Sequence, residues 1–462
     1  MSRRYDLVAR GRLVTPETII DGGWMAVAEG RIAAIGTGPS PDSAQVHDAG
    51  EGWIIPGVVD GQTHAGSYQG LSGIESTTRS AVAGGITTIV DMPYDNPDPL
   101  TSVETLDAKI AAIGELAHCG VALYATVAKG QSPDALAELA RRGVCAIKLS
   151  WFESHPVRFP RIPADQTLDV LIAAAELGLP VGLHNEDQEI VHGRIARMKA
   201  EGHSSIAAHS ASRPEASELA ATAAFLELGA VTGAHVHIVH ISVPRGFQLV
   251  ERYRSEGVNA TAELCVHYLV LDESIDGKRL GARMKVNPPI RSGVREGLWE
   301  ELDAGRVAFV STDHSSWPLS GKNVDSIFDA GAGVPGLETL VPVFFTGLAA
   351  RQDSPVRNTV RYLCEKPARF FGLWPRKGAL MVGSDADFAV IEPASWTYDS
   401  AKAHDDLNWS PFDGERFSVR VASTFVRGKQ AWDGMAIRST PGDGGYVRRN
   451  AVPAINREET VA

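Results

Sequence analysis

The sequence predicts an α/β fold, a (β/α)8 barrel of the TIM-barrel type, with a composite β-sandwich domain formed by the N- and C-terminal segments. Two observations predict it. Short apolar strand candidates alternate with helical stretches rich in alanine and leucine through the middle of the chain, and β-rich segments flank this middle on both sides. The length of 462 residues and the apolar content of 44% suit a barrel with a smaller second domain.

Both ends of the chain have the pattern of short strands and turns. YDLVARGRLVTP and GGWMAVAEGRIAAIG near the start, and DADFAVIEP and RFSVRVASTFVRGKQAWDG near the end, alternate apolar with small or polar residues. We therefore expect residues 1–52 and 376–448 to form one β-domain together. From Gly442 the chain is polar, and we expect residues 449–462 to be a tail.

The middle of the chain, residues 53–375, carries eight strand candidates with helices between them. The candidate helices are Thr101–His118, Pro133–Arg142, Thr167–Leu177 and Glu215–Leu228. The candidate strands are Ile54–Val59, Ile86–Met92, Val121–Val127, Val144–Leu149, Pro180–His184, Val236–Ile241, Val258–Leu264 and Val307–Asp313. Eight units favour a closed barrel, whose site lies at the carboxyl ends of its strands, over an open doubly wound sheet.

Composition excludes several classes of protein. A formal net charge of -12 argues against nucleic-acid binding, and we expect none. The four cysteines are scattered without a CxxC pair, which indicates a reducing compartment and no disulfide framework. We find neither a signal peptide nor an apolar run of about 18 residues. The expectation is a cytoplasmic protein without a membrane partner.

The predicted strands end in residues that bind metals. Three histidines, a lysine and an aspartate stand at the carboxyl ends of five separate strands: His64, Lys148, His184, His240 and Asp313. A barrel brings these positions to one rim, and this set of side chains is typical of a metal centre.

Each residue alone has an ordinary structural explanation. His64 and His184 could sit at the edge of the core, Asp313 could cap a turn, and Lys148 could pair with a carboxylate. His240 has a rival in His237, although a strand's period of two puts the pair on opposite faces. The shared position of all five at one end of the barrel favours the metal site.

Lys148 needs a separate argument, because an ammonium would repel divalent ions. Addition of CO2 to the amine reverses its charge and gives two oxygen donors that can bridge two metals. The apolar neighbours Ala146, Ile147 and Leu149 would bury the lysine stem, and burial favours the free amine. We expect Lys148 to be an N6-carboxylysine.

Several stretches of the chain form a specific set: IIPGVVDGQTH, AVAGGITTIVDMP, AIKLS, GLHNEDQ, HIVHIS, TAELCVHYL, KVNPPIR, STDHS, GVPGLET, RFFGLWPRKGAL and GSDADFAV. With these stretches the chain resembles the cyclic amidohydrolases of the amidohydrolase superfamily, the group of allantoinase, dihydroorotase and hydantoinase/dihydropyrimidinase. The resemblance runs from about Asp6 to Gly434. LNWSPFDGERF, near the end, is most similar to allantoinase.

The resemblance implies a barrel with a binuclear metal centre and a carbamylated lysine. It implies that His64 and Asp313 bind the more buried metal, that His184 and His240 bind the second, and that Lys148 bridges both. It also implies that Asp313 shuttles the proton. Asn287, in VNPPIR, takes the position of a substrate contact.

The sequence departs from the family in three places. The family has a histidine where this chain has Gln62, so the buried metal site should be weaker. The usual contacts for the carboxylate of dihydroorotate are replaced by Ala65, Gly66 and Tyr94, which predicts a neutral substrate and poor turnover of dihydroorotate. Hydantoinases have a tyrosine where Glu153 stands.

We therefore predict a metal-dependent hydrolase that opens a cyclic amide or ureide, with allantoin as the first candidate substrate. The alternative is a hydantoinase- or dihydropyrimidinase-type hydrolase of cyclic imides, and a third possibility is a non-catalytic scaffold relative. The expected cofactor is one or two divalent metals per chain: zinc first, with manganese or cobalt as alternatives. The expected assembly is a homo-oligomer, a dimer or a tetramer.

Overall fold

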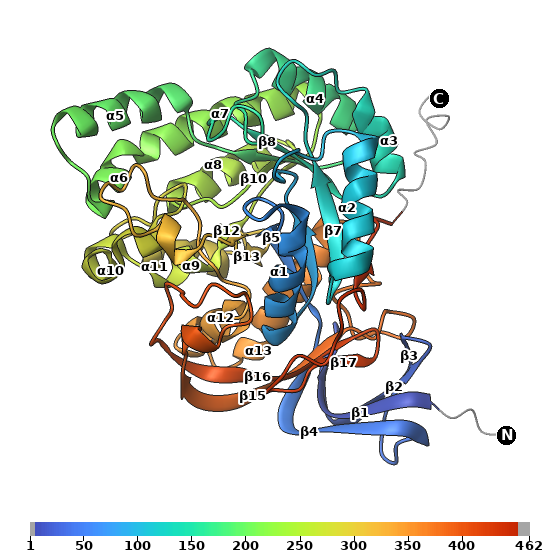
Figure 1. The fold of residues 1–462 in the computed structure, drawn as a ribbon. Coiled ribbons are helices and arrows are strands. Elements are labelled where there is room, and N and C mark those ends of the chain that lie inside the picture. Colours follow the sequence, from blue (N-terminus) through green and yellow to red (C-terminus); the bar gives the residue numbers. More distant parts are fainter. Residues whose placement is uncertain (1–4, 451–462) are drawn as a thin grey trace.

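A computed structural model describes residues 5–450 of the chain (Figure 1). Parallel strands with helices around them form a barrel, and a sheet made from both ends of the chain lies below it in this view. The predicted α/β class, with a (β/α)8 barrel and an additional β-domain, is confirmed. Residues 1–4 and 451–462 lie outside the described part, including most of the predicted tail.

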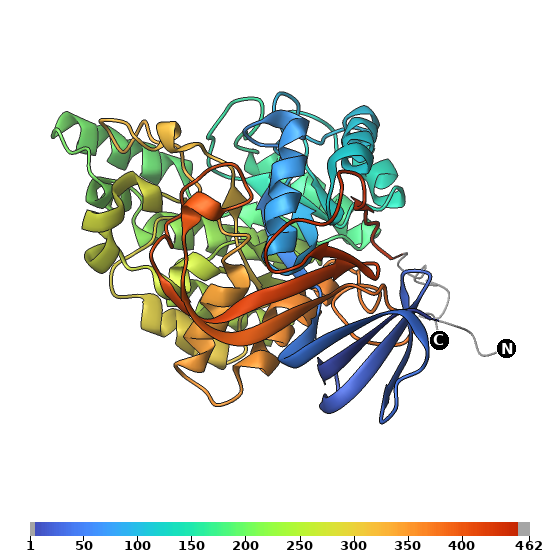
Figure 2. The same cartoon turned by 60° about the horizontal axis from the view of Figure 1, so that its bottom comes forward.

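The β-domain is a seven-stranded sheet to which both ends of the chain contribute. Its order is β17-β16-β15-β4-β1-β2-β3, and Figure 2 shows the N- and C-terminal strands side by side. Leu7, Met25, Phe388 and Phe425 pack in its core. The strands are β1 Tyr5–Val14, β2 Ile19–Ala28, β3 Arg31–Thr37, β4 Ser43–Pro56, β15 Phe388–Thr397, β16 Arg416–Val426 and β17 Lys429–Trp432.

The barrel strands follow one another in parallel around the ring. They are β5 Val58–His64, β6 Ile86–Asp91, β7 Gly120–Ala125, β8 Ala146–Ser150, β9 Val181–His184, β10 Val236–Ile238, β11 Ala260–Ala262, β12 Leu264–Cys265, β13 Val310–Ser311 and β14 His314–Ser315. Two pairings continue the ring between its ends, since β12 pairs with β13 and β14 pairs with β5. Each of the eight strand candidates overlaps one of these strands.

The first barrel strand begins later than the sequence indicated. The apolar run taken as Ile54–Val59 spans two strands, because Ile54 pairs with Val390 in the β-domain and β5 starts only at Val58. Gly57 connects β4 to β5. A Cβ added there would lie 2.0 Å from the Thr87 hydroxyl oxygen, so only glycine fits between the two sheets.

Helices surround the barrel (Figure 1). The four helix candidates are found as α2 Val103–Leu116, α3 Ala135–Arg141, α4 Ala164–Leu177 and α7 Glu215–Thr232. Ser102 is the N-cap of α2, and its hydroxyl accepts a hydrogen bond from the backbone N–H of Thr105 in a capping box. The remaining α-helices are α1 Gly73–Ala83, α5 Gln188–Ala200, α6 Ile206–Ser212, α8 Pro244–Ser255, α9 Val266–Val270, α10 Glu273–Leu280, α11 Arg295–Asp303, α12 Leu340–Ala349, α13 Pro355–Val360 and α14 Lys366–Phe370.

The polar segment that begins at Gly442 is not a free tail up to Asn450. β18, Gly445–Tyr446, pairs in parallel with the start of β7. That stretch of β7 is an open edge, because β8 pairs with β7 only from Tyr124 onward. Arg449 then donates to the carbonyls of Cys145 and Gly178. Backbone pairing and carbonyl capping hold this segment on the barrel without requiring apolar side chains.

Two further features bear on the predicted class of protein. Within residues 5–450, no helix combines the length and the apolar character needed to cross a membrane. The cysteines Cys119, Cys145, Cys265 and Cys364 are all buried and free of disulfide bonds.

Candidate active site

One cavity of about 380 Å³ opens at the carboxyl ends of the barrel strands. It collects every predicted site residue, although these residues come from six different parts of the chain. The lining includes Gln62, His64, Lys148, His184, His240, Asn287 and Asp313. The geometry places them together, and their roles as ligands and catalytic groups stay predictions at this point.

Gln62, His64 and Asp313 form one side of the cavity floor. The amide nitrogen of Gln62 donates to Asp313 Oδ1 at 2.8 Å, and His64 Nε2 lies 3.3 Å from the same oxygen. Burial would raise the pKa of Asp313, but the hydrogen bond and charge of His64 outweigh it and the pKa is lowered. Gln62 Oε1 is buried and has no hydrogen-bond partner among the described residues.

His184 and His240 form the other side. His184 Nδ1 and His240 Nε2 lie 3.0 Å apart, and His240 Nδ1 is buried with no partner in residues 5–450. His240 has φ 39 and Asp313 has φ 50, a left-handed backbone conformation that residues other than glycine rarely adopt. Such backbone strain concentrates at functional sites, and here it occurs at one residue on each side of the cavity.

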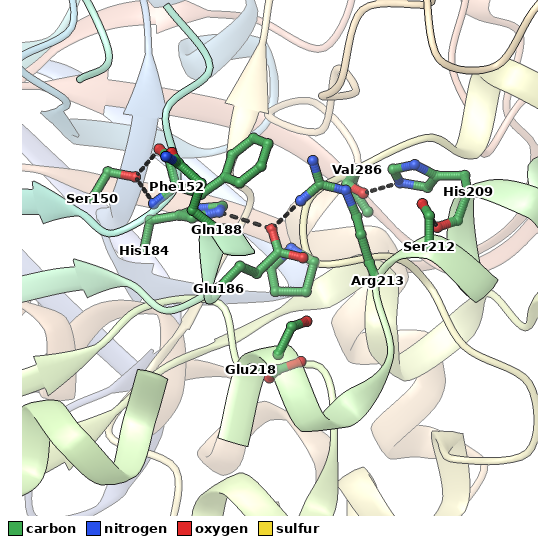
Figure 3. Close-up of polar contacts among 12 residues, drawn as sticks. Ser150, Phe152, His184, Glu186, Gln188, His209, Ser212, Arg213, Glu218 and Val286 are labelled. Carbon is green, nitrogen blue, oxygen red and sulfur yellow. Dashed lines mark hydrogen bonds and ion pairs between the residues drawn. The ribbon is translucent and has the colours of Figure 1, made fainter. Parts of the chain in front are cut away.

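A buried ion pair stands behind His184 (Figure 3). His184 Nε2 is 2.9 Å from Glu186 Oε2, and the Arg213 guanidinium donates to the same oxygen. Burial alone would raise the pKa of Glu186, but Arg213 and His184 outweigh it and lower the pKa to about 2. The ionised carboxylate can only accept, so His184 Nε2 carries a proton and Nδ1 offers its lone pair toward His240.

Sequence reasoning missed Glu186 and Arg213. Glu186 follows His184 by two residues, which was the available signal, whereas Arg213 comes from beyond two helices. Arg213 is fixed by stacking over the Phe152 ring, with its guanidinium carbon 4.3 Å from the ring centroid.

Lys148 lies between the two sides. The side chain is 1% exposed, and burial lowers its pKa to about 8, with Asp313 and Glu263 opposing the shift. Its charge also depresses the pKa of His184 and His240, although burial is the main cause in both. Lys148 is therefore close enough to influence groups on both sides of the floor.

Two other buried groups lie deeper in the barrel. Glu263 was not expected from the sequence; burial raises its pKa to about 8, and Ser311 donates to it at 3.3 Å. His237, the rival of His240, turns away from the cavity, with Nε2 3.3 Å from Glu263 and Nδ1 2.9 Å from Thr261. His240 lies beyond the end of β10, in a left-handed conformation, so the strand alternation expected from the sequence does not set the direction of its ring.

The side chains around the cavity can hold a divalent metal only if Lys148 also contributes a ligand. Within residues 5–450, no three His, Cys, Asp or Glu side chains are arranged to hold an ion by themselves. Each side offers two such groups, His64 with Asp313 and His184 with His240. The 3.0 Å between the two histidine nitrogens is close to the roughly 3.3 Å expected for two ligands of one tetrahedral zinc ion. An oxygen donor on Lys148 would give each side its third ligand.

The upper wall of the cavity is aromatic. The Tyr94 and Phe159 rings have centroids 3.7 Å apart, and Phe159 also lies 6.3 Å from His64 and 6.1 Å from His184. Tyr68 and Trp317 pack together at 5.1 Å. Asn287 Oδ1 is buried without a partner in the described chain, so it is available to accept from a bound ring N–H. These aromatic residues come from loops, and of the four only Tyr94 was singled out by the sequence.

A second cavity of about 500 Å³ lies between the barrel and the β-domain, with Glu338, Trp396, His404 and Trp432 among its lining residues. None of the predicted site residues lines it. Its charged groups already have partners, as His404 does in Glu338 at 3.1 Å and Arg420 does in Glu392.

The chain is similar to known proteins over nearly its whole length. The sequence model of the Amidohydrolase family matches residues 53–431. An allantoinase of Rubrobacter xylanophilus is 32% identical over 455 residues, covering 96% of this chain and 98% of that protein. An L-hydantoinase of Paenarthrobacter aurescens is 30% identical over 454 residues, with the same coverage of 96% and 98%.

Solved structures also match this chain over nearly its whole length. The L-hydantoinase (dihydropyrimidinase) from Arthrobacter aurescens superposes with a TM-score of 0.92 at 29% identity, covering 96% of this chain and 100% of that one. A D-hydantoinase superposes with a TM-score of 0.89 at 26% identity, covering 96% of this chain and 99% of that one.

Proposed function

Because the chain belongs to the Amidohydrolase family, whose members are generally metal-dependent, we propose that it hydrolyses a C–N bond of a cyclic amide or ureide and so opens the ring. The observation that carries this proposal is the meeting of His64, Asp313, His184 and His240 around Lys148 in one cavity. Allantoin is the first candidate substrate, since allantoinases are among the relatives that match nearly the whole chain.

We propose that the cavity holds one or two divalent ions, with zinc first and manganese or cobalt as alternatives. His64 and Asp313 would hold one ion and His184 and His240 the other, with a carbamate on Lys148 shared between them. The lowered pKa of Lys148, about 8, leaves an appreciable fraction of free amine near neutral pH, and the free amine is the form that adds CO2. A divalent ion so held supplies an activated water and polarises the ring carbonyl.

The side chains of this chain then handle the proton and the ring. Asp313, with its lowered pKa, is ionised and takes a proton from the attacking water. It passes this proton to the ring nitrogen, which is a poor leaving group until it is protonated. Gln62 holds Asp313 by the 2.8 Å hydrogen bond, and Asn287 Oδ1 accepts from a ring N–H.

Hydrolysis of hydantoins or other cyclic imides is the second candidate. The aromatic wall of Tyr94, Phe159, Tyr68 and Trp317 favours it, because these rings suit an apolar substituent on the substrate better than the polar ureido group of allantoin. The L-hydantoinase relative and its structural counterpart also support it.

The test is a turnover screen of the purified chain with allantoin, hydantoins, dihydrouracil and other cyclic imides, at saturating zinc, manganese or cobalt. Asp313→Asn should abolish ring opening, whereas Asp134→Asn, an exposed aspartate at the start of α3, should leave it unchanged. Absence of turnover with every ring and every metal would favour the scaffold alternative. Light scattering on the same sample checks the expected dimer or tetramer.

A further inference from the structure

A short turn, Ser154–Phe159, forms the cavity wall between β8 and α4. His155 and Phe159 pair as an antiparallel bridge, with Phe159 N donating to His155 O at 3.0 Å. The backbone N–H groups of Val157 and Arg158 both donate to His155 Nδ1, at 3.2 and 3.1 Å. Phe159 anchors the turn against Tyr94. The turn therefore has a defined conformation of its own.

This turn places the Arg158 guanidinium on the cavity wall. Nη1 donates to the Ser67 carbonyl at 2.6 Å, and Ser67 Oγ lies 3.1 Å from His64 Nδ1. No carboxylate within residues 5–450 comes within ion-pair distance of Arg158. Its Nε and Nη2 atoms make no hydrogen bond to the described chain and are not buried, so these donors are open to the cavity.

His155, on the same turn, offers a hydrogen-bond donor as well. His155 Nδ1 accepts two backbone N–H groups, so the neutral ring carries its proton on Nε2 and donates from there. Among the described residues lining the cavity, Asp313 is the only carboxylate, and it already contacts Gln62 and His64. Nothing in the cavity wall neutralises the charge of Arg158.

We propose that Arg158, assisted by His155, binds a carboxylate carried by a substituent of the cyclic amide substrate. This inference rests on the proposed ring-opening function, and within that function it favours a cyclic amide with an acidic substituent over allantoin, whose substituent is a ureido group. A guanidinium presents parallel N–H donors that match the two oxygens of a carboxylate, and the cavity offers it no internal partner. The sequence-based expectation of a neutral substrate depended only on Ala65, Gly66 and Tyr94. It did not include Arg158, which the Ser154–Phe159 turn places on the cavity wall.

The carboxylate could also be the one that ring opening creates, and the experiment separates the two sources. The probes are 5-(2-carboxyethyl)hydantoin and 5-(2-carbamoylethyl)hydantoin, which have the same shape and differ in charge. Both are assayed with the metal-loaded wild type, Arg158→Gln, Arg158→Lys and the control Arg194→Gln, which removes an exposed arginine on α5. Inhibition by the two ring-opened products is measured in parallel.

We expect the wild type to prefer the carboxyethyl compound. Arg158→Gln should lower kcat/KM on that compound about 10- to 100-fold and on the carbamoyl compound less than about threefold, as for loss of a hydrogen bond to a charged group. Arg158→Lys should lie between, because it keeps the charge and loses the paired donors. Arg194→Gln should match the wild type.

Equal loss on both compounds, or no loss on either, would overturn the proposal. Weaker inhibition by both products in Arg158→Gln, without discrimination between the substrates, would assign Arg158 to the new carboxylate and refute a substituent subsite. If no ring opens with any metal, the proposed function fails. The same stable compounds are then titrated calorimetrically, and tighter binding of the carboxylate that depends on Arg158 decides this inference separately.

Discussion

Gln62 donates a hydrogen bond to Asp313, with 2.8 Å between the amide nitrogen and Oδ1, at the position where the resemblance to the family implies a histidine. The Gln62 carbonyl oxygen is buried without a partner in the described chain. An amide oxygen is a weaker donor to zinc than an imidazole nitrogen. The glutamine therefore positions Asp313, and an ion held beside His64 would have one good ligand fewer.

From this arrangement we predict fewer than two tightly bound metals per chain, or one that exchanges readily. Gln62→His should retain more metal after dialysis against a mild chelator, measured by elemental analysis. Gln69→His, at an exposed position nearby that lies outside the cavity, is the matched control. Two ions that survive dialysis in the native protein as well as in Gln62→His would show that the site is not weakened.

The second prediction concerns Lys148. Carbonate-free apoprotein should regain metal and activity on addition of bicarbonate. At a constant concentration of dissolved CO2, the rate should rise as the pH rises toward about 8 and then level off, because only the free amine adds CO2. NMR with 13C-labelled bicarbonate should detect a carbamate carbon. Lys148→Ala should lose both signals, and short carboxylic acids should restore part of the metal binding. Full metal occupancy without any carbamate resonance would contradict the modification.

The third prediction separates positioning from stability in the Glu186–Arg213 pair. Glu186→Gln should weaken metal binding about 10- to 100-fold, because His184 loses the carboxylate that fixes its ring. It should also lower the free energy of unfolding by about 3–5 kcal/mol, since Arg213 is left buried and unpaired. The double variant Glu186→Gln/Arg213→Met should regain stability and still bind metal weakly.

Competition with a chelating dye measures the affinity, and chemical denaturation measures the stability. Glu189→Gln, on the exposed face of α5, is the control for both. If affinity recovered together with stability in the double variant, Glu186 would act only through the fold.

The fourth prediction concerns pH and stability in the metal-free protein. Burial raises the pKa of Glu263 from 4.5 to about 8, so between these values the folded state binds a proton that the unfolded state releases. Stability should therefore fall as pH rises from about 4.5 to about 8. Glu263→Gln keeps a neutral group of the same shape and should flatten this dependence, as followed by urea unfolding at several pH values. An unchanged slope would mean that Glu263 is ionised in the fold.

Residues at strand ends could be predicted because the barrel imposes a simple rule. Parallel strands end at one rim, so His64, Lys148, His184 and Asp313 meet whatever the loops do. Arg213 and Arg158 could not be found in this way, since each reaches the site from a loop whose path depends on tertiary contacts with Phe152 and Ser67.

The limits of the sequence pattern also follow from physical causes. Hydrophobic periodicity does not reveal that one apolar run crosses between two sheets at Gly57. It equally gives no signal for Gly445–Tyr446, which is held by backbone pairing with β7. In both places the deciding interaction involves atoms that every residue shares.

The pairing of β18 with β7 has a consequence for biosynthesis. The open edge of β7 is made early in translation, and the segment that covers it is made only after all the other barrel strands. β4 is in the same situation, because it precedes the whole barrel and its partner β15 follows it. The nascent chain therefore carries exposed strand edges through most of its synthesis, and such edges favour aggregation until the final strands arrive.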